Sequence, residues 1–179
     1  MKSVFKKIIK PAAILFIICF VVTVLLALTA EFTDRVIEEK AKRELNETRK
    51  SVLSGAVSFE AVDGYENAVY GVDESNNPAG YVFTITVDGY GGEMQAIVGI
   101  GDDGKVDGVN ILSHSETPGL GSKATEKDFL IQFEGLFEKA KAGQGVDMIT
   151  GATVSSEAVI RAVNIAIEEY ISIAGGENE

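Results

Sequence analysis

The chain has 179 residues, of which 16 are basic and 27 acidic, for a formal net charge of −11, and it contains one cysteine and one histidine. A single cysteine excludes an intrachain disulfide, and one cysteine with one histidine cannot alone build a zinc or iron–sulfur site. The acidic balance argues against nucleic-acid binding, and the scarcity of metal ligands favours a carried organic cofactor as the source of any reactivity.

The first thirty residues have the composition of a membrane anchor. Residues 12–30 carry no charge, and as a helix rising about 1.5 Å per residue they span roughly 28 Å, close to a hydrocarbon core of about 30 Å. Four lysines precede this run, so residues 1–11 are expected to form a basic cytoplasmic tail, with the rest of the chain outside. A cleavable signal peptide also starts with basic residues, but its apolar core is shorter and residues 28–30 fit a cleavage site poorly. We therefore expect a single-pass transmembrane helix at 12–30.

Residues 31–53 are rich in Glu, Lys, Arg and Ala and predict a helical stalk. Residues 31–179 contain 12 basic and 27 acidic residues. Such a surface disfavours anionic lipid and suggests protein partners, although solubility alone also explains it. Residues 54–173 have the length of one domain, and residues 174–179 are expected to form a flexible tail.

Short β-branched and aromatic runs follow the stalk, separated by turn sequences. Strands are expected at residues 56–62, 68–72, 80–87, 94–99 and 106–112, and they predict an antiparallel meander. Alternation places Tyr81, Phe83, Ile85 and Val87 on one face, as a sheet covered on one side by helices requires.

Residues 99–104 match the letters of a dinucleotide-binding fingerprint. That fingerprint must be followed by a helix, whereas residues 105–109 have the pattern of a strand. We expect a hairpin turn there.

A second motif follows the last strand and reads His114-Ser115-Glu116-Thr117-Pro118-Gly119-Leu120-Gly121. Pro118 fixes its own φ and biases Thr117 toward extended geometry, while Gly119 and Gly121 permit turns and close backbone approach. The motif predicts a rigid lip, with an ordinary Pro-Gly turn as the alternative. His114 is expected to be a hydrogen-bonding loop residue.

Residues 125–141 have helical periodicity and are expected to form one helix, which residues 143–145 end. Its expected core-facing residues are Phe129, Leu130, Phe133, Leu136, Phe137 and Ala140.

The C-terminal motif reads Asp147-Met148-Ile149-Thr150-Gly151-Ala152-Thr153-Val154-Ser155-Ser156. Apolar residues at helical spacing follow it, which places a helix start between Thr153 and Ser156. They are Val159, Ile160, Val163, Ala166, Ile167, Tyr170 and Ile171. The first amides of a helix lack partners and its dipole is positive there, so this start suits a phosphate. Gly151 and Ala152 leave the Thr153 hydroxyl accessible; the alternative is a loop with an ordinary helix cap.

Thr150-Gly151-Ala152-Thr153 resembles the attachment motif of the FMN-binding domain family, with Thr150 in place of the more usual serine. The run from Glu116 to Gly121 resembles the loop of the G subunit of Rnf electron-transport complexes and, less closely, of the C subunit of the sodium-pumping NADH:quinone oxidoreductase. The G subunit is preferred because the chain is compact and its loop matches without a gap. The resemblance covers residues 1–173 and fits an α+β fold, in which an antiparallel sheet is packed by helices.

The resemblance implies an electron-carrier subunit of a membrane redox pump that couples electron flow between ferredoxin and NAD to Na⁺ or H⁺ transport. One FMN per chain would be esterified through its phosphate to Thr153 by a flavin transferase, making Thr153 a phosphorylated residue. Neither a catalytic acid or base nor a metal site is implied. Other expected FMN contacts are Thr150, Gly151, Ala152, Ser156, Glu116, Thr117, Leu120, Gly121 and Lys123.

The same resemblance implies that the partners are the other membrane and peripheral subunits of the Rnf complex, in the cell inner (plasma) membrane. The N-terminus would be cytoplasmic and the FMN domain extracytoplasmic, with no contact to nucleic acid. The alternative from another class is a membrane-anchored binding or signalling module without flavin.

Overall fold

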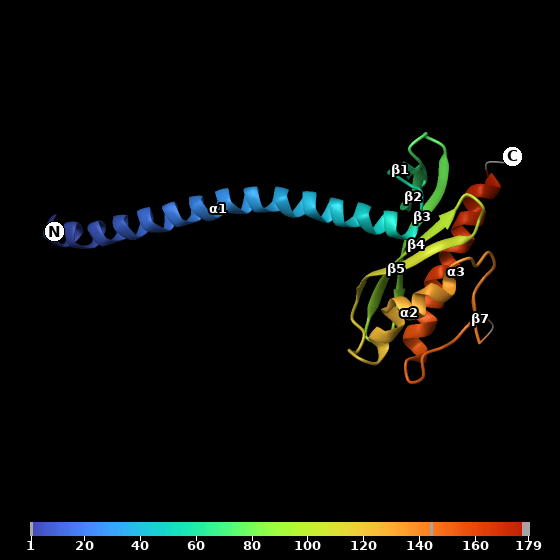
Figure 1. Ribbon diagram of the computed structural model, residues 1–179. Coiled ribbons are helices and arrows are strands. Elements are labelled where there is room, and N and C mark those ends of the chain that lie inside the picture. The colour runs from blue at the N-terminus through green and yellow to red at the C-terminus, as the bar shows by residue number, and fades with distance from the viewer. Residues whose placement is uncertain (1, 144, 177–179) are drawn as a thin grey trace. The chain divides into compact units, whose positions relative to one another are not determined.

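The computed structural model describes residues 2–143 and 145–176, with side chains from residue 12 except 27–36, 38–39 and 175–176 (Figure 1). The chain divides into two units, residues 1–45 and 46–179, which are described separately. The long elements are α1 (Lys2–Val52), β1 (Ser58–Val62), β2 (Tyr65–Val72), β3 (Pro78–Asp88), β4 (Glu93–Gly101), β5 (Val106–His114) and α3 (Thr153–Gly176). The short elements are η1 (Gly121–Thr125), α2 (Lys127–Leu130), η2 (Ile131–Phe133), β6 (Lys141–Ala142) and β7 (Gly145–Val146).

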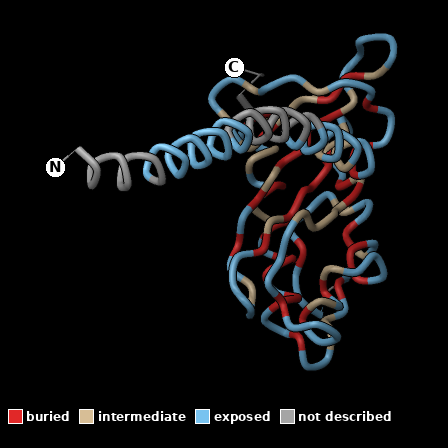
Figure 2. The backbone as a smooth tube through the Cα atoms, turned by 90° about the vertical axis from the view of Figure 1, so that its left-hand side faces the viewer, coloured by how far each residue is buried: buried red, intermediate tan, exposed pale blue. Residues whose placement is uncertain are grey.

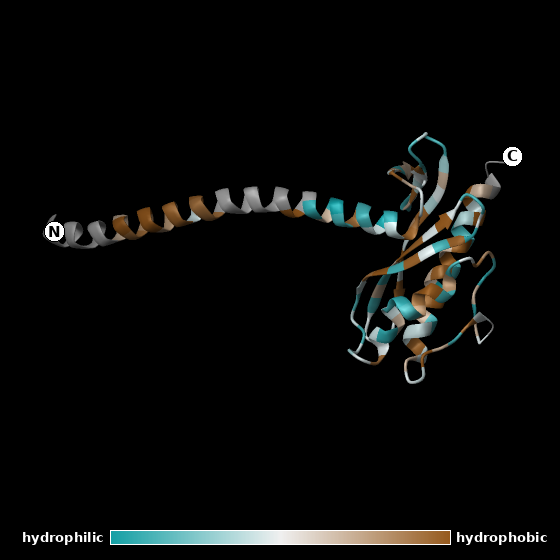
Figure 3. Ribbon diagram, in the orientation of Figure 1, coloured by the Kyte–Doolittle hydropathy of each residue, from teal (hydrophilic) through white to brown (hydrophobic). Residues whose placement is uncertain are grey.

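The described part of the first unit is one continuous helix, the longer part of α1. The helix predicted for residues 31–53 is confirmed, ending one residue early at Val52. The described apolar side chains between residues 14 and 26 are exposed, as the pale blue tube in Figure 2 and the brown stretch in Figure 3 show.

In the part of the chain that the structure describes, no helix has the length and apolarity that a membrane crossing needs. The side chains of residues 27–30, the last four of the predicted crossing at 12–30, and those of the predicted basic tail lie outside the described residues. So do residues 177–179 of the expected flexible tail.

The second unit contains the predicted antiparallel meander. Its five strands lie in the order β1-β2-β3-β4-β5, and all four pairings are antiparallel. The hairpin turn expected at residues 99–104 is confirmed, because the Gly104 N–H donates to the Gly101 carbonyl (2.9 Å) and the chain re-enters the sheet as β5. Gly101 and Gly104 of that run therefore form a turn between two strands and do not lead into a helix.

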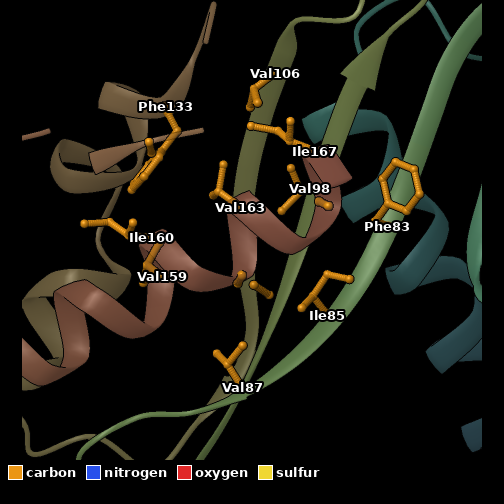
Figure 4. Packing of buried hydrophobic residues seen from close by; sticks show 14 of the residues in the cluster. Phe83, Ile85, Val87, Val98, Val106, Phe133, Val159, Ile160, Val163 and Ile167 are labelled. Atoms are coloured by element: carbon orange, nitrogen blue, oxygen red, sulfur yellow. The ribbon is translucent and has the colours of Figure 1, made fainter. Parts of the chain in front are cut away.

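The core lies between one face of this sheet and α3. Tyr81, Phe83, Ile85 and Val87 alternate along β3 and are all buried, as predicted. Val159, Val163 and Ile167 of α3 belong to the same buried cluster, together with Val98 of β4, as Figure 4 shows for Phe83, Ile85 and Val87. The predicted apolar face of the helix is wrong at Ile171, which is 60% exposed although Ile173, two residues further on, is buried in the core.

The prediction of one helix at residues 125–141 is wrong. Two short helical turns, α2 and η2, end at Phe133, and the chain then turns at Gly135, whose φ is +79°. The Gly135 N–H donates to the Val106 carbonyl (2.7 Å) and the Val106 N–H donates to the Leu136 carbonyl (2.8 Å). These bonds to the start of β5 replace the bonds that a helix would make.

The predicted inward positions of that segment are partly correct. Phe129, Leu130, Phe133 and Ala140 are buried, and Leu136 packs against the core from a half-buried position. Phe137 was predicted to face the core but is 65% exposed, because the helical phase on which that prediction relied ends at Gly135.

The opposite face of the sheet receives the last turn of α1. Val52 and Leu53 are buried there against glycines of three strands, Gly71, Gly99 and Gly108. A Cβ at Gly99 would overlap the carbonyl oxygen of Val52, so only glycine lets the helix end approach the sheet this closely. The Asp107 carboxylate accepts a hydrogen bond from the Ser54 N–H and fixes the residue after the helix.

We expect Gly99→Ala to lower the free energy of unfolding by about 1–3 kcal/mol, because the added methyl must displace the backbone of Val52. Gly101→Ala is the matched control, since its Cβ would closely meet only the tip of the Asp103 side chain. Urea unfolding of the full chain in detergent measures both. Equal stabilities of the two variants would contradict this account of the helix–sheet contact.

Candidate functional site

The C-terminal motif forms a left-handed turn followed by the start of α3. Gly151 has φ = +83°, and the Ala152 N–H donates to the Ile149 carbonyl (2.9 Å). The Ala152 carbonyl accepts the bond from the Ser156 N–H (2.9 Å), and α3 begins at Thr153, within the predicted window. The amides of residues 153–155 precede the first acceptor that the helix offers, so they face outward with the positive end of the dipole.

Residues 117–122, which we call the lip, form a compact loop that begins with a Pro-Gly turn, the alternative that the sequence left open. The amides of Leu120 and Ser122 both donate to the Thr117 carbonyl (3.2 Å each), and the Gly119 N–H donates to the Ser122 hydroxyl (2.9 Å). Gly119 has φ = +75°, which only glycine adopts without strain. The loop is therefore held by its own hydrogen bonds, and its last two residues begin η1.

A cavity of about 310 Å³ lies between the lip and the helix start. Thr117, Leu120 and Gly121 line it from the lip, and residues 151–155 line it from the turn and the first residues of α3. Tyr90, from the turn between β3 and β4, completes the lining. The exposed side chain of Thr153 is part of this wall, so a group attached to its hydroxyl would be next to the cavity.

Glu116 lies beneath the cavity and does not line it. It is only 5% exposed, and its carboxylate is shared between two other segments. Oε2 accepts a hydrogen bond from the Ser155 hydroxyl (2.7 Å), and Oε1 accepts one from the Tyr90 N–H (2.8 Å). One side chain thus joins the lip, the first turn of α3 and the turn between β3 and β4.

Three glycines make room for this junction. A Cβ at Gly89 or at Gly121 would overlap the Glu116 carboxylate, and a Cβ at Gly91 would overlap the Ser115 carbonyl. None of the three has a positive φ, so close approach and not backbone conformation requires glycine here.

His114 is a loop residue held by hydrogen bonds, as expected. Its Nδ1 accepts from the Glu116 N–H (3.2 Å), and its Nε2 lies 3.4 Å from the Thr125 hydroxyl, which itself donates to the Ser122 carbonyl (2.8 Å). Because a backbone amide can only donate, Nδ1 carries no proton in this arrangement and Nε2 is the donor.

The remaining predicted contacts lie around the cavity rather than in its lining. The Ser156 hydroxyl is buried and accepts a bond from the Ile149 N–H (3.3 Å), whereas Thr150 and Lys123 are exposed. The contacts of these residues with a cofactor stay predictions, as do those of Glu116 and of the residues that line the cavity. Sequence reasoning did not assign Tyr90 to the site, although the Gly89-Tyr90-Gly91-Gly92 turn, an aromatic residue between glycines, was the available signal.

The lining combines polar and apolar groups that suit a ligand with an anionic part and an apolar part. The Thr153 hydroxyl and the first amides of α3 are polar, and Leu120, Val154 and Tyr90 supply apolar surface. Among the described residues, no group of three or more His, Cys, Asp or Glu residues is placed to hold a metal ion.

Comparison with family models matches residues 89–168 to an FMN-binding domain and residues 1–52 to an RnfG N-terminal region. The chain is 32% identical over 170 residues to the G subunit of the proton-translocating ferredoxin:NAD(+) oxidoreductase complex of Clostridium ljungdahlii, covering 90% of each chain. It is 36% identical over 185 residues to the G subunit of the ion-translocating oxidoreductase complex of Methanosarcina acetivorans, covering 96% of this chain and 98% of that one.

Among solved structures, the chain is similar to the NqrC protein of Shewanella oneidensis, with a TM-score of 0.48 and 20% identity. That match covers 63% of this chain and 66% of the other. The C subunit of the Na(+)-translocating NADH-quinone reductase of Parabacteroides distasonis matches with a TM-score of 0.48 and 21% identity, covering 58% and 60% of the two chains.

We expect Glu116→Ala to reduce the free energy of unfolding by about 1–3 kcal/mol, because the Ser155 hydroxyl and the Tyr90 N–H lose their acceptor inside the protein. The control is Glu93→Ala, which removes an exposed carboxylate from the first residue of β4, next to the turn that carries Tyr90. We expect it to change the free energy of unfolding by no more than about 0.5 kcal/mol. Thermal unfolding followed by circular dichroism compares them. A Glu116 variant as stable as the control would show that the junction contributes nothing.

Proposed function

Because the chain belongs to the family of G subunits of ion-translocating oxidoreductase complexes, we propose that it is the FMN-carrying electron-transfer subunit of such a complex. The complexes in which its relatives are named are oxidoreductases acting on ferredoxin and NAD(+). The chain's own part is to hold the flavin, which supplies the chemistry by accepting electrons and passing them on. No acid, base or metal of this chain is needed for that part.

The observation that carries this proposal is the position of Thr153. Thr153 is the first residue of α3, and its side chain is exposed. It lines a cavity whose other walls are the lip and the β3–β4 turn. We place the covalent bond between the Thr153 hydroxyl oxygen and the phosphate of FMN, made by a flavin transferase. The small residues before it, Gly151 and Ala152, leave the hydroxyl open to that enzyme.

The helix start gives the phosphate an electrostatic reason to stay there. The amides of Thr153, Val154 and Ser155 point away from the helix, and the dipole favours negative charge at this end. Thr150, two residues before Ala152, is exposed and offers the phosphate a further hydroxyl. The apolar side chains of Leu120 and Val154 would cover part of the ring and keep water from it.

We further propose that residues 12–30 cross the plasma membrane once, with the N-terminus in the cytoplasm and the FMN domain outside. The uncharged run, the lysines before it and the exposure of its described apolar side chains support this arrangement. Attachment by a covalent bond fits that location, because a flavin lost outside the cell cannot be replaced from the cytoplasmic pool. The partners are then the other subunits of the complex.

We expect intact mass spectrometry of the full chain, produced together with a flavin transferase, to show one added FMN per chain. Thr153→Val should abolish the added mass, since the acceptor oxygen is gone. Thr86→Val is the matched control, because it makes the same change at an exposed threonine of β3 that does not line the cavity, and it should keep the flavin. A wild-type chain without flavin would favour the flavin-free binding module. Flavin retained by Thr153→Val would move the attachment to another residue.

The membrane anchor has its own test. Ile17→Arg with Val21→Arg should release most of the chain from membranes in alkaline carbonate, because each arginine at the centre of a span costs about 2.5–3.5 kcal/mol. Ile37→Arg, an equally exposed apolar position of the same helix beyond the predicted span, is the control and should stay in the membrane fraction. Full retention of the double variant would argue against a crossing at 12–30.

A further inference from the structure

Tyr90 combines a fixed backbone with a free aromatic ring. It lies in the turn between β3 and β4, its side chain is 73% exposed, and it lines the cavity beside Thr153. Single exposed aromatic residues are common on protein surfaces and by themselves need no explanation. What distinguishes Tyr90 is how firmly the rest of the protein holds its main chain.

The turn that carries Tyr90 is held from several directions. The Gly89 N–H donates to the Gly92 carbonyl (2.8 Å), closing the turn, and the Tyr90 N–H donates to the buried Glu116 carboxylate (2.8 Å). The Arg161 guanidinium of α3 donates to the Asp88 carbonyl (2.6 Å) at the base of the turn. Gly89 and Gly91, on either side of Tyr90, pack so closely against the residues just before the lip that neither has room for a side chain.

The ring itself has no such attachment. Among the ring contacts within the described part of the chain, Tyr90 takes part in none. The fold therefore orders the main chain of a tyrosine next to a cavity and leaves the aromatic face to solvent. Because the main chain is already ordered, binding a flat ligand to this ring costs only the rotational freedom of the tyrosine side chain.

The other large apolar side chains of the cavity wall come from different segments. Leu120 belongs to the lip and Val154 to the first turn of α3, and both are exposed. With Tyr90 they form three apolar walls around the position next to Thr153. A planar ring attached through Thr153 would thus meet one aromatic and two aliphatic surfaces.

We propose that Tyr90 is a wall of the flavin site, against which the isoalloxazine ring stacks. This rests on the proposed function, since it requires a flavin at Thr153. The oxidised isoalloxazine ring is electron-poor and the tyrosine ring is electron-rich, so stacking stabilises the oxidised form over the reduced one. Tyr90 then lowers the reduction potential of the bound flavin and quenches its fluorescence.

The test compares full-length flavinylated chains with wild-type Tyr90, Tyr90→Phe and Tyr90→Leu. Leucine keeps a shorter apolar side chain but removes the aromatic face, and the fold is preserved because the Tyr90 side chain is 73% exposed. The control is Phe137→Ala, which removes another aromatic ring that is 65% exposed and does not line the cavity. Intact mass first measures how much flavin each chain carries, and fluorescence and midpoint potential are then expressed per attached flavin.

We expect Tyr90→Leu to be several-fold brighter than wild type and to have a higher midpoint potential. Tyr90→Phe and Phe137→Ala should resemble wild type, which would assign the effect to the ring face and not to the hydroxyl. Equal fluorescence and potential in wild type and Tyr90→Leu, with flavin attached to both, would overturn the stacking proposal and leave the carrier function intact. Absence of flavin from every chain would overturn both.

Discussion

The cavity exists because one buried carboxylate satisfies two groups that the sequence places far apart. Glu116 directly precedes the lip. Its carboxylate accepts one hydrogen bond from the Ser155 hydroxyl of α3 and another from the Tyr90 N–H, in the turn between β3 and β4. A carboxylate with so little exposure is stable only when such donors surround it. The three segments around the cavity therefore hold one another in place, and no one of them forms the site alone.

Glycine allows both of the close contacts on which the domain depends. At the cavity, Gly89, Gly91 and Gly121 let the turn and the lip approach the carboxylate. On the outer face of the sheet, Gly71, Gly99 and Gly108 accommodate Val52 and Leu53 at the end of α1. The sheet is consequently covered on two sides, by α3 along its core face and by a single helical turn on the other.

Sequence patterns predicted the elements that are governed by local rules. The strands, the hairpin turn at residues 99–104 and the helix start at Thr153 follow from alternation, turn residues and capping. The pairing of the two motifs was expected only from the family resemblance. Patterns failed where tertiary hydrogen bonds compete with helical ones, as at Gly135 and Leu136, which pair with Val106. They also could not show that Glu116 turns inward, because its partners Ser155 and Tyr90 are 39 and 26 residues away.

The helix that begins at Thr153 continues through the most buried part of the domain, where Val159, Val163 and Ala166 pack under the sheet. A group attached to its first residue is joined to the core and not to a surface loop, which opens more easily than the structure around it. The rate of electron tunnelling falls exponentially with the gap between donor and acceptor. A flavin held at Thr153, as proposed, would keep that gap nearly constant, because α3 packs against the core along its length.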